Sequence, residues 1–384
     1  MKYKILVHTP HLSTPGGKQN YYTALQDKFQ NNVDYFFYGS HGKKEHFIQT
    51  IIRLISQYWI FYRQLKKNDY DLVHLNPSLN PKSYYRDSIF TWISVKTAKK
   101  TIVFWRGWNW EFESKKVQKT LPYFHATFGK ANAMIVLAEE FKNQLVNYGY
   151  HEPIHIETTV VDDRMIAQSD SDIEIPRSSE IKLLFLSRIE NEKGIFETLE
   201  SFAKLKSKFP ELRLDIGGVG GALEKAKEYA EQNNLKNIHF HGWVTGEQKK
   251  RLLTNCSLFV FPTYHGEGMP NCVLEAMVSR KPIITTAIGG VKDFFLDGQM
   301  GYLVNTKDSD HLQLRLEELL TNRDLMKEMG HFNQQFGQTK FEAQTVCNRL
   351  ERIYSAVITE QNTSHRWYQK SGSAEISNIT QNTN

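Results

Sequence analysis

Two glutamates eight positions apart are the residues of this chain whose spacing points most directly to chemistry. Glu267 is followed by Gly268 and Met269, and Glu275 lies in the apolar run that comes next. A proline is favoured in the first turn of a helix, so a helix beginning near Pro270 would leave backbone N–H groups free at its N-terminus. That helix end favours an anionic ligand, and carboxylates hydrogen-bond hydroxyl groups well. The spacing therefore predicts a site for a ligand rich in hydroxyls that also carries negative charge.

Two other interpretations of the glutamate pair stay open. Paired carboxylates also serve as acid and base in glycoside hydrolysis, although a helix with a free N-terminus favours binding over flanking a scissile bond. A solvated loop and helix without a ligand is the simpler alternative, because two glutamates eight positions apart are common on exposed helices.

The longer block around these glutamates resembles the signature of the family 4 retaining glycosyltransferases. It runs from Phe261 to Met277 and reads FPTYHGEGMPNCVLEAM. Members of that family have the GT-B fold and use nucleotide-activated sugars. The resemblance covers the second half of the chain closely and the first half loosely. It implies an α/β protein with two doubly wound, Rossmann-like domains facing each other across a cleft, and a hexosyltransferase-type activity.

The resemblance also implies roles for particular residues. Arg188 and Lys193 follow a predicted strand at 182–187, and they match the family's cation pair that stabilises the leaving diphosphate. A surface ion pair with a neighbouring glutamate is the alternative for these cations. With them, Glu267 completes the implied catalytic set by holding sugar hydroxyls, while Glu275 binds the ribose hydroxyls. The other implied donor-binding residues are Gly16, Gly17, Gly218, Gly242, Trp243, Gly268, Met269, Pro270 and Asn271.

Two glycine-rich turns follow predicted strands. The turn at 217–221 could belong to a dinucleotide-binding fingerprint, but the acidic residue expected on a following strand is missing, which argues against a nicotinamide enzyme. The turn containing Gly16 and Gly17 precedes a predicted helix, so it suits a phosphate group. An ordinary strand-to-helix turn is the alternative for that loop.

One position departs from the family pattern. Arg106 stands where members usually have a histidine that contacts the donor sugar. An arginine stays protonated and cannot act as a base, but it can bind a phosphate or an acidic acceptor through two hydrogen bonds. The neighbouring Trp108, with Trp105 and Trp110, could stack on a sugar or simply pack in the core.

Composition limits the classes of protein that remain. The 384 residues suggest two domains. The sequence contains no apolar run of about 18 residues, so we expect no membrane-spanning helix. No signal peptide precedes the first strand pattern, and the three scattered cysteines suit a reducing compartment, so we expect a cytoplasmic protein. No metal-ligand cluster is present, so the nucleotide diphosphate sugar is the expected co-substrate and no cofactor or metal is expected.

Charge is unevenly distributed along the chain. Residues 1–165 contain 22 basic and 14 acidic residues, a net charge of +8, while the rest contain 26 and 28, a net charge of −2. A basic first half suits an acidic acceptor or an anionic membrane at the inner membrane face, although plain solubility is the alternative. No nucleic-acid motif appears, so nucleic acid is not an expected partner.

Strand patterns alternate with helix patterns in both halves, which predicts parallel sheets. The predicted elements include a strand at 258–261 and helices at 20–29, 121–130, 271–278 and 323–332. We expect an acceptor-side domain at 1–165, a nucleotide-sugar domain at 180–340, and a last helix at 343–358 that crosses back to the first domain. A polar linker at 164–180 and a disordered tail at 361–384 complete the prediction. An apolar and basic helix at 47–67 could lie on a membrane or pack its stripe on the sheet.

The function predicted from the sequence is transfer of a sugar from a nucleotide diphosphate sugar to an acceptor hydroxyl with retention, in surface polysaccharide or glycolipid biosynthesis. The acceptor would be a glycan or a lipid-linked group. Three rivals stay open: a GT-B epimerase or phosphorylase, a catalytically inactive nucleotide-sugar-binding protein, and a nicotinamide enzyme.

Overall fold

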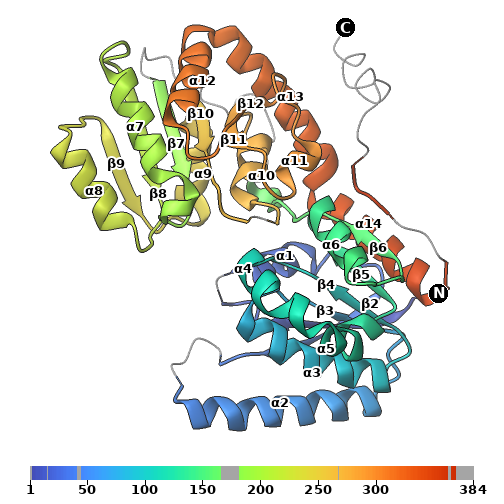
Figure 1. Cartoon of the computed structure of the whole chain (residues 1–384). Coiled ribbons are helices and arrows are strands. Elements are labelled where there is room, and N and C mark those ends of the chain that lie inside the picture. The colour runs from blue at the N-terminus through green and yellow to red at the C-terminus, as the bar shows by residue number, and fades with distance from the viewer. Residues whose placement is uncertain are drawn as a thin grey trace, which may run out of the picture. The chain divides into compact units, whose positions relative to one another are not determined.

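A computed structural model of the chain describes residues 2–14, 16–40, 45–165, 181–266, 268–361 and 365–368. The chain divides into two compact units, each built on its own six-stranded parallel sheet (Figure 1). The first unit contains the described residues of Met1–Val160, Gly266–Met269 and Ala343–Gln369. The second contains those of Val161–His265 and Pro270–Glu342.

The first sheet has the strand order β2-β1-β3-β4-β5-β6. Its central strands are short apolar runs, because a parallel sheet is covered by helices on both faces. Ile5, Leu6 and Val7 of β1, for example, are fully buried. The strands are β1 (Lys4–Pro10), β2 (Asn32–Tyr38), β3 (Leu72–Leu75), β4 (Thr101–Phe104), β5 (Ala133–Val136) and β6 (Ile154–Ile156).

Helices cover both faces of the first sheet. The helices α1 and α14 pack against each other, and α2 packs against α3 (Figure 1). Pro81 begins α3, and the side chain of Asn80 caps that helix by accepting from the backbone N–H of Ser83 at 3.1 Å. The helices are α1 (Gly17–Leu25), α2 (Phe47–Lys67), α3 (Pro81–Thr97), α4 (Trp110–Phe112), α5 (Leu121–Ala126), α6 (Glu139–Asn147) and α14 (Ala343–Ile358).

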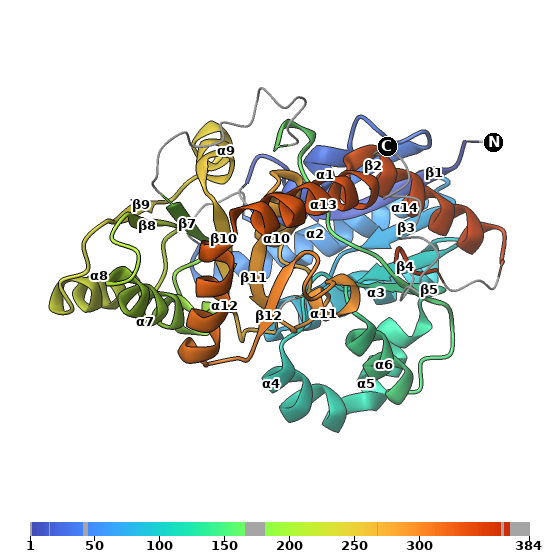
Figure 2. The same ribbon diagram turned by 90° about the horizontal axis from the view of Figure 1, so that it is seen from above.

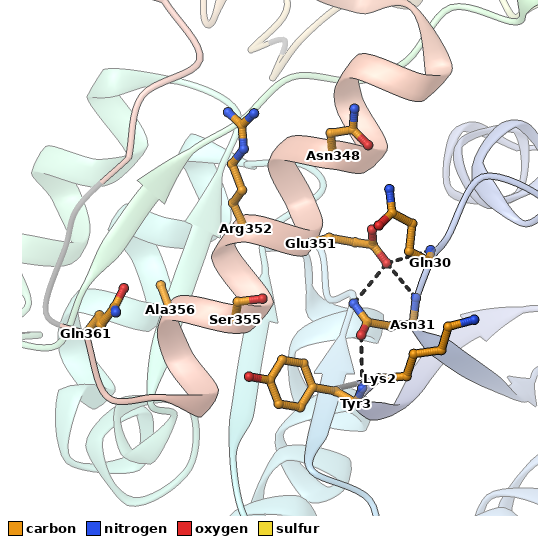
Figure 3. Close-up of a pocket in the computed structure, with 10 residues that line it drawn as sticks. All are labelled: Lys2, Tyr3, Gln30, Asn31, Asn348, Glu351, Arg352, Ser355, Ala356 and Gln361. Atoms are coloured by element: carbon orange, nitrogen blue, oxygen red, sulfur yellow. Dashed lines mark hydrogen bonds between the residues drawn. The ribbon is translucent and has the colours of Figure 1, made fainter.

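Buried charge fixes α14 to the first unit. One carboxylate oxygen of Glu351 accepts hydrogen bonds from the backbone N–H groups of Gln30 and Asn31, both at 2.8 Å, and from the Asn31 side chain at 2.9 Å (Figure 3). Two residues earlier in the helix, Arg349 pairs with the fully buried Glu157 at 3.0 Å. Loss of either partner in the buried pair would leave an uncompensated charge, so these contacts specify where the helix docks.

The second sheet has the order β12-β11-β10-β7-β8-β9. Figure 2 shows α7, α8 and α12 on one face of this sheet and α9, α10 and α13 on the other. The strands are β7 (Ile181–Leu186), β8 (Leu212–Gly217), β9 (Ile238–Gly242), β10 (Leu258–Phe261), β11 (Ile283–Thr286) and β12 (Gly301–Val304). The helices are α7 (Ile195–Lys206), α8 (Leu223–Gln232), α9 (Gly246–Asn255), α10 (Asn271–Val278), α11 (Val291–Phe294), α12 (Ser309–Thr321) and α13 (Arg323–Phe341).

Each sheet has one point where the direction of winding reverses. In the first sheet, β1 lies between β2 and β3, and in the second, β7 lies between β10 and β8. Loops that leave two such neighbouring strands diverge to opposite faces and leave a crevice at the carboxyl ends. The topology therefore places a candidate ligand site after β7 and β10, and a second one after β1 and β3.

The structure confirms the predicted α/β class with two doubly wound halves, and it corrects several local predictions. The edge strands β6 and β12 and the helices α4 and α11 were missed, because three or four residues carry too little periodicity. The helix predicted at 323–332 continues to Phe341. The helix predicted at 121–130 ends at Ala126, and a separate 3₁₀ turn, Phe128–Lys130, follows.

Part of the predicted disordered tail is ordered. Trp367 donates its backbone N–H to the carbonyl of Ile156 at 3.2 Å, and both Trp367 and Tyr368 are buried. Two aromatic side chains inside a polar segment gain enough from burial to offset the entropy of ordering, which composition alone did not indicate. Residues 362–364 and 369–384 lie outside the described residues, as does most of the predicted linker.

Candidate active site

The predicted cation pair lies at the winding reversal of the second sheet. Arg188 comes two residues after β7 and is exposed, whereas Lys193 is only 4% exposed at the end of a 3₁₀ turn, Asn191–Lys193. Both residues follow the carboxyl end of β7, which is where ligands bind in sheets of this kind. The exposed guanidinium can therefore reach a ligand in solvent, while the position of the lysine is fixed by its surroundings.

The loops after β7 and β10 are joined by backbone hydrogen bonds. The carbonyl oxygen of Glu192 accepts from the backbone N–H groups of Tyr264 at 2.9 Å and His265 at 3.0 Å. Gly194 has φ +82°, and a Cβ there would overlap the carbonyl oxygen of Pro262. Only glycine permits both that backbone conformation and that approach. The start of α7 is thereby held against the loop that leads to α10.

The glycine-rich turn after β8 packs directly on the loop after β7. Gly218 has φ +141°, and a Cβ there would overlap the carbonyl oxygen of Ser187. The backbone N–H of Ile189 donates to the carbonyl of Val219 at 3.0 Å, and that of Ala222 donates to the carbonyl of Ile189 at 2.9 Å. The turn thus positions the segment that carries Arg188.

The turn after β9 leaves an aromatic side chain in solvent. Gly242 has φ +66°, and Trp243 is 57% exposed. Immediately before them, His241 Nε2 lies 2.7 Å from Asp215 Oδ1 of β8. Sequence reasoning missed this pair, because the two residues are 26 positions apart and only the pairing of β8 with β9 brings them together. The carboxylate fixes the orientation of the imidazole beside the exposed tryptophan.

The N-terminus of α10 lies at its predicted position, and Pro270 precedes the helix. The helix begins at Asn271, and Pro270 is the cap residue rather than the first helical residue. No side chain caps this end, and the side-chain oxygen of Asn271 is buried without a hydrogen-bond partner among the described residues. Uncapped N–H groups at a helix start suit an anionic or hydroxyl-bearing ligand. Glu267 itself lies outside the described residues.

Glu275 has a partner that the sequence did not reveal. Its Oε1 atom lies 2.6 Å from Nζ of Lys249 in α9, and the two side chains are 12% and 21% exposed. Burial raises the pKa of Glu275, and the nearby Lys249 offsets part of that effect. Glu275 is therefore a partly desolvated carboxylate that a single lysine helps to keep ionised. A ligand with two adjacent hydroxyls could use the same oxygen atoms.

The first sheet carries a second polar site at its own winding reversal. Lys18, in the first turn of α1, donates to the carbonyl oxygen of Asn76 after β3 at 2.5 Å. Burial lowers the pKa of Lys18 to about 7. Fully buried His8 stacks on Tyr38 with ring centroids 4.2 Å apart, and burial lowers its pKa to about 3. Sequence reasoning missed both residues, although a histidine inside an apolar strand was a visible signal.

Arg106 lies over aromatic rings rather than beside a carboxylate. Its guanidinium is 4.0 Å from the Tyr21 ring centroid and 4.3 Å from that of Phe104. One of its terminal nitrogens is buried without a hydrogen-bond partner, and no carboxylate pairs with it in the described part of the chain. Burial lowers its pKa. An arginine held in this way retains donors for an anionic ligand.

The tryptophans near Arg106 have different environments. Trp108 is 4% exposed and stacks on Phe141 with ring centroids 4.9 Å apart, and Trp105 is fully buried. Core packing therefore describes these two rings better than a sugar-binding platform. Trp110 is 37% exposed and is the one of the three with an accessible ring.

The predicted site residues fall into three groups. The carboxyl edge of the second sheet holds Arg188, Lys193, Gly218, Gly242, Trp243, Pro270, Asn271 and Glu275. The carboxyl edge of the first sheet holds Gly16, Gly17, Arg106 and Trp108, and Gly16 precedes α1 as its cap residue. Gly268 and Met269 group with the first unit by their contacts. The first group alone offers cations, backbone donors and a carboxylate for a sugar nucleotide.

The fold and this edge define a doubly wound α/β protein with a candidate ligand site at a winding reversal. Comparison with known sequences describes the second unit more narrowly. Residues 168–336 match the family model for glycosyl transferases group 1. This match confirms the predicted resemblance and, for this part of the chain, the predicted glycosyltransferase class.

Two relatives illustrate the reach of the similarity. The capsular polysaccharide biosynthesis glycosyltransferase CapM of Staphylococcus aureus is 27% identical over 229 residues, and the alignment covers 58% of this chain and 58% of CapM. An uncharacterized glycosyltransferase of Methanocaldococcus jannaschii is 21% identical over 315 residues, with 79% of each chain covered. The similarity therefore extends beyond the second unit at lower identity.

Solved structures share the whole fold. Sucrose-phosphate synthase from Thermosynechococcus elongatus superposes with a TM-score of 0.76 at 15% identity, covering 94% of this chain and all of that one. Anabaena HepE, solved in complex with UDP and glucose, gives a TM-score of 0.72 at 14% identity and covers 92% of this chain. The predicted GT-B type of fold is confirmed.

Proposed function

We propose that this protein is a retaining glycosyltransferase that moves a sugar from a nucleotide diphosphate sugar to an acceptor hydroxyl. The observation that carries the proposal is the carboxyl edge of the second sheet. There, backbone contacts join the loops after β7, β8 and β10, and these loops carry Arg188, Lys193 and the uncapped start of α10. The match to the glycosyl transferases group 1 model over the same segment supports it.

The donor would be bound by three kinds of group. Glu275 would accept hydrogen bonds from the two ribose hydroxyls, replacing or sharing its contact with Lys249. Arg188 and Lys193 would face the diphosphate, and Glu267 would hold the sugar hydroxyls. The turn at Gly242 and Trp243 would contact the base. HepE was solved with UDP and glucose, which makes a uridine diphosphate sugar the first donor to test.

The resemblance to retaining enzymes implies that the chemistry takes place on one face of the sugar. The bond from the anomeric carbon to the phosphate oxygen breaks, and the acceptor oxygen forms a new bond on the same face. The proton of the acceptor hydroxyl passes to the departing phosphate oxygen. Arg188 and Lys193 would stabilise the negative charge that develops on the diphosphate. The departing phosphate oxygen would itself serve as the base. We also propose that the reaction is independent of a metal.

The first unit would supply the acceptor end of the reaction. Arg106 lies at the carboxyl edge of the first sheet against aromatic rings, without a carboxylate partner among the described residues. Lys18 lies at the same edge, and its lowered pKa of about 7 leaves it partly protonated at neutral pH. An anionic or lipid-linked glycan suits such a site better than a neutral sugar. We propose a role in surface polysaccharide or glycolipid assembly at the inner membrane face, consistent with CapM among the relatives.

The test is a titration of the purified protein with UDP-, GDP- and ADP-sugars, followed by thermal unfolding with and without EDTA. One base should raise the melting temperature, as expected when a ligand binds only the folded state. The variant Glu275→Gln should lose most of that shift, while Glu231→Gln, an exposed change on α8, should keep it. Absence of a shift with every donor would refute the proposal. A shift without transfer to any acceptor would favour the inactive binding protein.

A further inference from the structure

The largest group of exposed apolar side chains in the described chain lies on α2. Ile48, Ile55 and Trp59 are 69%, 63% and 60% exposed, and they lie on one side of the helix at spacings of seven and four residues. The full stripe on α2 is Ile48, Ile51, Ile52, Ile55, Trp59 and Tyr62, and it ends at the exposed Lys66.

This stripe is not the face that packs on the first unit. Phe61 and Leu65 are the buried residues of α2, and they lie on a different side of the helix from Ile55 and Trp59. The 21 residues of α2 make a rod about 31 Å long. The sequence left open whether the apolar residues pack on the sheet. The structure shows that two of them do so fully, and that most of the others face solvent.

A second stripe of the same kind lies on the neighbouring helix. Lys82, Tyr85, Ile89, Trp92 and Lys96 of α3 are spaced three or four residues apart, and all five are exposed. Because α3 packs against α2 (Figure 1), the two stripes belong to one side of the first unit. We call the two stripes together the α2–α3 face.

The composition of the α2–α3 face identifies its partner. Tryptophan and tyrosine concentrate where a bilayer meets water, and lysines reach from such a surface to the lipid headgroups. The helix α2 contains four basic residues and no acidic residue. The only acidic residue of α3, Asp87, is buried and paired with Arg86 at 2.7 Å. The exposed charge on both helices is therefore entirely positive.

A second copy of this chain would fit the face less well. A symmetric dimer places the same patch on both subunits, so the lysines of one copy would meet lysines of the other without acidic partners. An anionic lipid surface satisfies both the apolar side chains and the positive charge.

We propose that the α2–α3 face binds the surface of an anionic lipid bilayer, with the apolar side chains at the boundary between headgroups and acyl chains. The inference extends the proposed function, because it names the surface that would bring the protein to a membrane-bound acceptor. It does not depend on the donor site, so the two can fail separately. Within the described residues, no helix is both long and apolar enough to span a bilayer. The proposed contact of the α2–α3 face runs along the membrane surface.

Flotation with vesicles tests the proposal. The full-length protein should float with vesicles of phosphatidylcholine and phosphatidylglycerol, and not with phosphatidylcholine alone. The variant Ile52→Gln/Ile55→Gln/Trp59→Gln should lower the partition coefficient by at least about tenfold, because it removes exposed apolar area while keeping helix-forming side chains. The matched control is Leu314→Gln, which changes a side chain that is 62% exposed on α12 of the second unit.

Charge is tested in the same way. Lys66→Gln/Lys67→Gln should weaken binding to the anionic vesicles by about thirtyfold, and the control Lys225→Gln on α8 should not. Equal binding to neutral vesicles, or unchanged binding of the apolar variant, would overturn the proposal. The proposal would also be overturned if the wild type does not float with vesicles but forms a dimer in light scattering, and the apolar variant abolishes that dimer. Glu275→Gln should float normally even where it loses donor binding, which separates the two assignments.

Discussion

Replacing Glu275 with glutamine should weaken donor binding without weakening the fold. Glutamine has the shape of a protonated glutamate and can still accept a hydrogen bond from Lys249, which lies 2.6 Å from the carboxylate. Burial raises the pKa of Glu275, so the folded protein already favours the neutral form more than the unfolded chain does. The neutral variant should therefore be at least as stable as the wild type near neutral pH.

The effect on donor binding has the opposite sign. A hydrogen bond to a charged group contributes about 1.5–3 kcal/mol and one between neutral groups about 0.5–1.5 kcal/mol. If the carboxylate holds both ribose hydroxyls, glutamine loses about 1 kcal/mol on each bond, or about 2 kcal/mol in total, which is about thirtyfold in Kd. Isothermal titration with the preferred sugar nucleotide measures this, and thermal unfolding without ligand measures stability.

The pH dependence of binding gives a second measurement. As the pH falls, the carboxylate of Glu275 should protonate above the usual range for glutamate, because its pKa is raised, and donor affinity should fall with it. Lys249→Met removes the charge that lowers this pKa, so the loss should move to higher pH. Equal donor affinity of Glu275→Gln and the wild type at neutral pH would refute the assignment of Glu275 to the ribose.

Three further predictions follow from the site. Lys193→Ala should lower kcat by roughly a hundredfold with a smaller change in donor Kd, and the control Lys225→Ala should change neither. An effect on Kd alone would show that Lys193 does not act in the chemical step. Gly218→Ala should abolish the thermal stabilisation by the donor and should lower Tm more than Gly298→Ala does. Both glycines have positive φ, which costs about 1–3 kcal/mol of strain for another residue, but only Gly218 lies against a backbone carbonyl. Equal effects on Tm would contradict this packing. Arg106→Gln should raise KM for an anionic acceptor by about tenfold and leave a neutral acceptor unchanged, and equal changes for both acceptors would argue against an anion site.

Local sequence patterns predicted closely which helix or strand carries each motif. The helix at 271–278 and the strand at 258–261 were predicted with their observed bounds, because an apolar run next to a proline and glycine cluster is a strong local pattern. The start of α1 was placed three residues late, since a helix that begins at Gly17 has no capping side chain to mark it. The ordered residues 365–368 were missed because their order depends on pairing with β6.

The sequence determined the alternation of strands and helices, the resemblance carried by the block around Glu275, and the basic character of the first half, because each depends on residue type and near neighbours. Only the tertiary structure decided which distant groups meet. It placed Lys249 against Glu275, aligned Asp215 with His241, and turned the apolar stripe of α2 toward solvent. Those outcomes depend on strand order and helix packing, which bring together residues that no local pattern links.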